Sequence, residues 1–133
     1  AMPEAKDTHG TAFKNGSVTL MARVVGNNGA NIVPVDITEV VYSIFLLDDR
    51  NPDGRTAVVG HSAVPLPIHE VVMSTLVVDP RWTVDQTGYN FCHTPDVSFH
   101  PAFAVAGRRY LVEYCLTAAI GQAILIRFRI NVV

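Results

Sequence analysis

The sequence predicts an all-β protein, a sandwich of seven or eight short antiparallel strands, and three observations support this fold class. Val occurs 20 times and Thr 10 times among the 133 residues, and β-branched side chains fit the pleated surface of a sheet. Glu, Lys and Gln, which usually fill exposed helix surfaces, occur only 4, 2 and 2 times. Eight Pro and nine Gly are spread along the chain, as expected for many strands joined by turns.

Length and charge limit the class of protein further. A chain of 133 residues suits one domain. Hydrophobic residues make up 49% and charged residues 17%, which excludes a disordered chain. The net charge of −2 offers no electrostatic footprint for nucleic acid. No apolar stretch reaches the roughly 18 residues that a membrane-spanning helix needs, so we expect no membrane partner.

The first half of the chain alternates between arm, strands and turns. Residues 1–16 are polar and small, which predicts a flexible N-terminal arm ahead of a single sandwich domain at residues 17–133. Residues 17–25 alternate between apolar and polar positions, as in a half-buried strand. Pro34 limits residues 32–35 to a short edge piece. Residues 36–48 are apolar on both faces, which predicts a central strand covered on both sides.

The second half contains the clearest pattern. Residues 55–64 predict a returning strand, residues 70–79 suit either a strand or a short helix, and residues 89–93 predict a short strand. Residues 109–117 and 122–133 then alternate strictly around a turn at residues 118–121. This pattern predicts a β-hairpin with one buried face.

The run Ala106-Gly107-Arg108-Arg109-Tyr110-Leu111-Val112-Glu113-Tyr114, followed by a turn and a final strand, resembles the last two strands of immunoglobulin-like β-sandwiches of the bacterial and phage structural type. The resemblance covers residues 106–133 and implies a Greek-key order of strands. It also implies that the Tyr110 hydroxyl ties the corner before its strand. Modules of this type serve as structural, adhesive or carbohydrate-binding parts, and the fold alone does not select among these roles.

One turn has the spacing of a cation site. Asp49, Asn51 and Asp53 alternate before Gly54 and place oxygen ligands as in the first half of a calcium loop. Gly60 stands where such a loop requires a bidentate Glu, and Pro52 interrupts the spacing. The same residues are strong turn formers. A polar hairpin turn and a calcium turn therefore both remain open.

Other chemistry has weaker support. Cys92, His93 and His100 lack the tight spacing of a zinc site, and Cys92 and Cys115 are expected to be two reduced thiols rather than a disulfide. The chain has no Gly-x-Ser-x-Gly run and no phosphate-binding Gly-rich loop. We therefore expect no enzyme and no cofactor, and the sequence leaves the cellular compartment open.

The surplus of apolar residues carries the functional prediction. A two-layer sandwich has one interior, yet apolar residues also fall on outward positions, and few charges remain to cover them. We expect a structural assembly subunit that forms a homo-oligomer or docks on other protein subunits, such as a virion or tail component. The candidate partner-binding residues lie on the final hairpin: Leu111, Leu125, Arg127 and Arg129. The alternative is a ligand-binding or adhesive module, with an aromatic platform on Trp82 and Tyr89.

Overall fold

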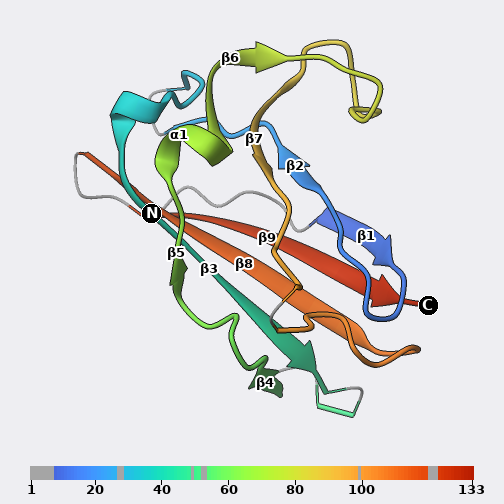
Figure 1. Cartoon of the computed structure of the whole chain (residues 1–133). Coiled ribbons are helices and arrows are strands. Elements are labelled where there is room, and N and C mark those ends of the chain that lie inside the picture. The colour runs from blue at the N-terminus through green and yellow to red at the C-terminus, as the bar shows by residue number, and fades with distance from the viewer. Residues whose placement is uncertain (1–7, 27–28, 49, 52–53, 99, 120–122) are drawn as a thin grey trace.

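The computed structural model describes residues 8–26, 29–48, 50–51, 54–98, 100–119 and 123–133, and these form two β-sheets with almost no helix (Figure 1). The large sheet has the order β1-β9-β8-β3-β4, and β5 also pairs with β3. Its strands are β1 (Thr8–Ala12), β3 (Ile37–Leu47), β4 (Arg55–Ala57), β5 (Val64–Pro65), β8 (Arg109–Ala118) and β9 (Ala123–Val132). The small sheet has the order β2-β7-β6, with β2 (Leu20–Ala22), β6 (Val72–Val77) and β7 (Tyr89–His93).

Strands β8 and β9 form the predicted hairpin, with nine residue pairs from Arg109↔Asn131 to Thr117↔Ala123. Alternate residues of both strands are buried, as their sequence pattern requires. On the other edge of β8, β3 pairs in antiparallel register, with Tyr42 opposite Tyr114. The apolar run at residues 36–48 is therefore central in the strand order, with β8 along one edge and β4 and β5 along the other. The predicted cover on both faces is not found among the described residues, because the small sheet packs on one face while Val41, Ser43 and Phe45 on the other are half-buried.

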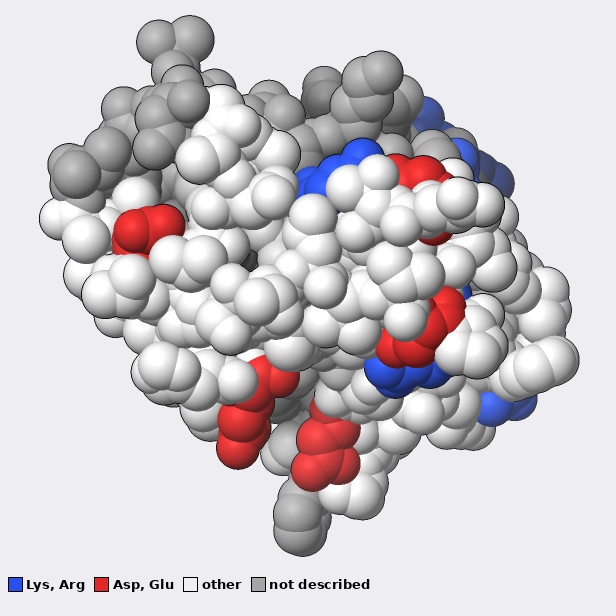
Figure 2. All heavy atoms as spheres, turned by 90° about the horizontal axis from the view of Figure 1, so that it is seen from above, with Lys and Arg blue, Asp and Glu red and all other residues white. Residues whose placement is uncertain are grey.

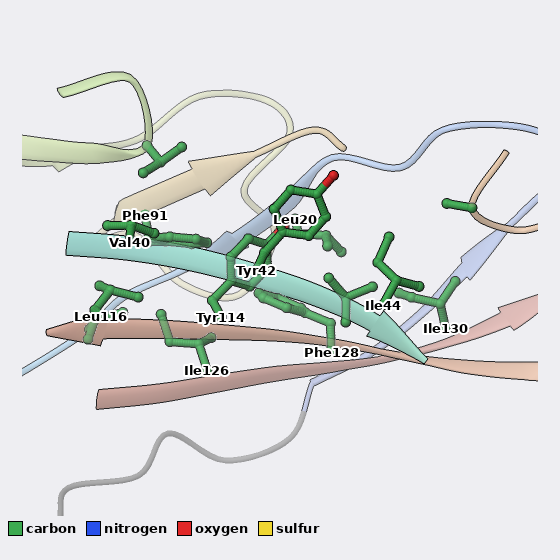
Figure 3. Close-up of a cluster of buried hydrophobic side chains, with 14 of the residues drawn as sticks. Leu20, Val40, Tyr42, Ile44, Phe91, Tyr114, Leu116, Ile126, Phe128 and Ile130 are labelled. Carbon is green, nitrogen blue, oxygen red and sulfur yellow. The ribbon is translucent and has the colours of Figure 1, made fainter. Parts of the chain in front are cut away.

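The core lies between the two sheets (Figure 3). The core side chains of β3, β8 and β9 point to the same side of the large sheet, toward the small sheet. Tyr114 is the aromatic centre, with its ring 4.7 Å from that of Phe91 and 5.8 Å from that of Phe128, both edge-on. Such edge-to-face contacts stabilise a core beyond the area they bury. The small sheet is thus fixed to the large one by packed aromatic rings.

Tyr110 makes the contact that the resemblance implied. Its hydroxyl accepts a hydrogen bond from the backbone N–H of Val105, five residues upstream, at 3.2 Å. Its ring also packs edge-on against Phe103, with the centroids 5.6 Å apart. The loop before β8 is therefore held at both its polar and its apolar side.

The structure differs from the sequence prediction at several elements. All-β is confirmed, but the described residues form nine strands rather than seven or eight, and β1 pairs with β9 in parallel rather than antiparallel fashion. Residues 8–12, predicted within a flexible arm, form β1 because their backbone pairs with the edge of β9, a contact that needs no apolar side chains. The ambiguous residues 70–79 contain both elements, the end of α1 (Ile68–Val71) and all of β6.

The remaining regular element is a short 3-10 turn, η1 (Pro34–Asp36), just before β3. Pro34 opens this turn because its missing N–H has no role in the first turn of a helix. Among the described residues, no helix is long and apolar enough to cross a membrane.

Candidate interaction surfaces and a buried Tyr–His network

The predicted cation turn lies in the connection between β3 and β4. Asp49 and Asp53 lie outside the described residues. Asn51 is exposed, and its carbonyl accepts the N–H of Gly54 at 2.9 Å, while the N–H of Asp48 donates to the Gly54 carbonyl at 2.9 Å. The part of the chain that the structure describes holds no cluster of three metal-ligating side chains.

The predicted partner-binding residues share the outer face of the large sheet. Leu111 pairs with Arg129, and two residues further along β9 Arg127 lies opposite Glu113. The Arg127 Nε donates to Glu113 Oε2 at 3.1 Å, so this arginine already has an acidic partner within the chain. Leu111 is only 4% exposed, whereas Leu125 and Arg129 are half-buried.

A second arginine covers the same outer face. The Arg55 guanidinium lies 4.3 Å from the centre of the Phe45 ring. It also stands 3.9 Å from the Glu113 carboxylate. Phe45 pairs with Leu111 in the register of β3 and β8. The outer face is therefore a salt-bridged surface with apolar side chains under arginine stems, and not a bare apolar patch.

The face over the small sheet is poor in charge. Figure 2 shows this face from above as a broad uncharged area. The basic side chains in this view lie next to acidic ones, and separate acidic side chains lie nearer the margin. The segments that surround the small sheet carry exposed valines, at 81% for Val35 and 72% for Val84, with Val25 and Val78 also exposed. Large exposed apolar side chains on a charge-poor face are typical of protein interfaces.

Two aspartates organise the loop at residues 79–88, at one end of this face. Asp85 accepts from the indole Nε1 of Trp82 at 2.9 Å and from the guanidinium of Arg23 at 2.6 Å. Asp79 accepts from Arg81 at 3.0 Å and from the Tyr89 hydroxyl at 2.6 Å. The hydrogen bond from Arg81, and then that from Tyr89, lower the pKa of Asp79 to about 2. Both charges of each pair are thus satisfied inside the chain.

The same loop borders a small hollow of about 230 Å³. Arg81, Trp82 and Val84 line one side, Leu20 and Met21 of β2 line another, and Phe128 and Ile130 of β9 lie in its wall. Trp82 is half-buried and held in place by Asp85. The other half of the predicted aromatic platform is missing, because Tyr89 is buried.

Two tyrosines and two histidines form a hydrogen-bonded network in the core, in which Tyr42, Tyr114 and His61 are buried and His93 is half-buried. The Tyr42 hydroxyl is 2.7 Å from His61 Nδ1, and His61 Nε2 is 2.6 Å from the carbonyl of His100. Because that carbonyl only accepts, Nε2 carries a proton, and in the neutral form of the ring the Tyr42 hydroxyl donates to Nδ1. The Tyr114 hydroxyl is 2.7 Å from His93 Nδ1.

Burial changes the titration of these groups. Desolvation, and after it the charge of His61, lowers the pKa of His93 to about 4. Burial raises the pKa of Tyr114 well above its ordinary value, and burial followed by the charge of Asp96 raises that of Tyr42. Both tyrosines therefore remain neutral hydrogen-bonding groups near neutral pH.

Sequence reasoning treated these histidines singly, as half-buried or loop residues. The available signal was the pair of inward tyrosines, because a buried tyrosine hydroxyl needs a partner. The two cysteines are free and half-buried on different sheets, and burial raises the pKa of each thiol.

Comparison of the chain with protein-family models, with curated proteins and with solved structures found no match.

Proposed function

We propose that this protein is a non-enzymatic assembly subunit that binds a second copy of itself through the charge-poor face over the small sheet. The observation that carries the proposal is the set of exposed valines on the segments that surround the small sheet, where two arginines are paired within the chain and the separate acidic side chains lie nearer the margin. Interface cores are depleted in charge and enriched in apolar contact.

Charge favours a second copy as the occupant. Arg23 is bonded to Asp85 and Arg81 to Asp79, so two such faces can meet without opposing an unpaired cation to its twin. A two-fold contact uses the same patch on both subunits, which makes this self-compatibility a requirement. The predicted surface on the hairpin is less suitable, because Leu111 is buried and Arg127 is paired with Glu113.

Matched valine variants test the proposal. Val35 and Val59 are 81% and 80% exposed, but Val59 lies between β4 and β5, away from the small sheet. We expect Val35→Asp to shift the protein toward monomer in light scattering, while Val59→Asp keeps the mass of the original chain. Equal masses for the two variants, with the original chain oligomeric, would place the interface elsewhere and reject this face.

The immunoglobulin-like, Greek-key arrangement is part of the same proposal, and the Tyr110 hydroxyl bond to Val105 supports it. It extends the proposed role to multimeric scaffolds such as virion or tail components.

A second function is favoured by the hollow beside Trp82, whose indole is fixed before any ligand arrives. A fixed aromatic ring next to threonine and arginine side chains suits a small ligand with one flat apolar face, such as a sugar. Titration with glucose, galactose and N-acetylglucosamine, followed by Trp82 emission, tests this function. We expect saturable quenching with at least one sugar, and an emission unchanged by all three contradicts it.

A further inference from the structure

We infer that the Tyr42–His61 and Tyr114–His93 pairs form an acid-sensitive latch between the sheets, in which protonation of His93 loosens the small sheet from the large one. The inference concerns a conformational device and is independent of the proposed self-association.

The latch joins residues of both sheets. Tyr42 and Tyr114 are directly opposed on β3 and β8 of the large sheet. His93 is the last residue of β7, at the centre of the small sheet's strand order. The bond from its Nδ1 to the Tyr114 hydroxyl therefore joins the two sheets through the core.

The rings of the latch also pack against one another. The His93 ring lies 5.1 Å from that of Tyr42 and 5.5 Å from that of Tyr114, which it meets edge-on. Tyr42 in turn lies 5.8 Å from His61. Each imidazole is thus in contact with Tyr42, and the two histidines share one tyrosine between them.

Several charged and titratable groups face the latch. From β3 and β8 these are Tyr42 and Tyr114, both neutral. From β7 it is the neighbouring Cys92 thiol, which interacts with Tyr114. From the loops these groups are His61, Asp96 and His100. Asp96 interacts with His61, so the one carboxylate of this group is placed to compensate His61 rather than His93.

A proton on His93 is therefore unfavourable in the folded protein. Burial and the neighbouring His61 lower the pKa of His93 from 6.5 to about 4. The unfolded chain binds this proton at pH values where the folded chain does not. Stability from the neutral ring is consequently complete above about pH 6.5 and is lost progressively as the pH falls toward 4.

The size of the effect follows from linkage. After a discount for the part of the ring that water reaches, the lowered pKa of His93 raises the unfolding constant roughly tenfold between pH 7 and pH 5. Carboxylates such as Asp79 and Asp85 titrate below this window, because their hydrogen bonds lower the pKa of each. The change in the unfolding constant between pH 7 and pH 5 thus reports histidine rather than these carboxylates.

The experiment compares His93→Gln with His69→Gln between pH 7 and pH 5. His69 is an exposed histidine on α1, so its replacement is the matched control. Unfolding in urea is followed by Trp82, the only tryptophan, which lies in a loop of the small sheet. We expect the roughly tenfold rise in the original chain and in His69→Gln, and a rise of less than about threefold in His93→Gln.

If His93→Gln does not fold, two measurements on the original chain test the latch instead. The first is an NMR titration of the His93 ring, expected to show a pKa below about 5.5. The second is amide hydrogen exchange, expected to accelerate in β7 and β6 before β8 and β9 as the solution is acidified, after correction for the intrinsic rate. A His93 pKa of 6 or above, or exchange that accelerates equally in both sheets, overturns the latch.

Discussion

Replacement of Asn90 by Leu tests how the small sheet is closed at its β2 edge. Asn90 is 1% exposed, and its side chain binds the segment that follows β2. Its Oδ1 accepts the N–H of Val24 at 2.7 Å, and its Nδ2 donates to the carbonyls of Val24 at 2.9 Å and Ile32 at 3.2 Å. The amide thus continues the pairing with β7 after the β2–β7 ladder has ended at Ala22.

The expected cost follows from which partners remain. The Val24 carbonyl keeps a second bond, because it also accepts the N–H of Ile32 at 3.1 Å. The Val24 N–H and the Ile32 carbonyl lose the bond that Asn90 supplies. A buried polar group left unpaired costs about 1–3 kcal/mol, so we expect Asn90→Leu to lower the free energy of unfolding by about 3 kcal/mol. Leu has the branching of Asn but is larger, and its methyl groups cannot approach the backbone of Val24 as closely as 2.7 Å, so poorer packing adds to this loss.

Urea unfolding at fixed protomer concentration, followed by Trp82 emission and by circular dichroism, measures the change. Asn31→Ala is the control, because Asn31 is an exposed residue next to Ile32 that pairs with Val25 in an isolated β-bridge. We expect it to change stability by less than about 0.5 kcal/mol. If Asn90→Leu behaved like this control, the side-chain clamp would not hold the sheet edge and the reasoning would be refuted.

Two other predictions concern loops. Gly60→Ala should lower the free energy of unfolding by more than the roughly 1 kcal/mol that its positive φ costs, because an added Cβ would meet the ring of His100. Gly29→Ala, at φ +80 with nothing within 4 Å of an added Cβ, should cost only the backbone strain. Thermal melts of the two variants test this difference. Asp85→Asn should lower Tm and shift Trp82 emission to the red, because a neutral amide holds the Trp82 indole and the Arg23 guanidinium less strongly; unchanged emission would show that Asp85 does not fix the ring.

The sequence predicts the large sheet well because its signal is local. In β8 and β9 every second residue is apolar, and a slip by one residue would turn that whole set toward water. The apolar run at residues 36–48 likewise indicates a strand in the middle of a sheet, although its outward side chains are half-buried rather than covered by a further layer.

Other elements depend on contacts that no local pattern encodes. β1 is made of small and polar residues, and its place is set by backbone bonds to an edge of β9 more than a hundred residues away. The Tyr–His network is similar, because Tyr42 and His61 or Tyr114 and His93 meet only after the sheets have packed. Asn90 gave one signal, a polar residue inside an apolar strand, but not its partners.

The molar mass of the original chain in solution tests the central claim most directly. Size-exclusion chromatography with light scattering, at protein concentrations from about 1 to 100 μM, measures it over the range in which typical interfaces form. Self-association predicts a mass that reaches an integer multiple of the 14.5 kDa chain and falls toward 14.5 kDa on dilution or in Val35→Asp. A mass of 14.5 kDa throughout that range would contradict it.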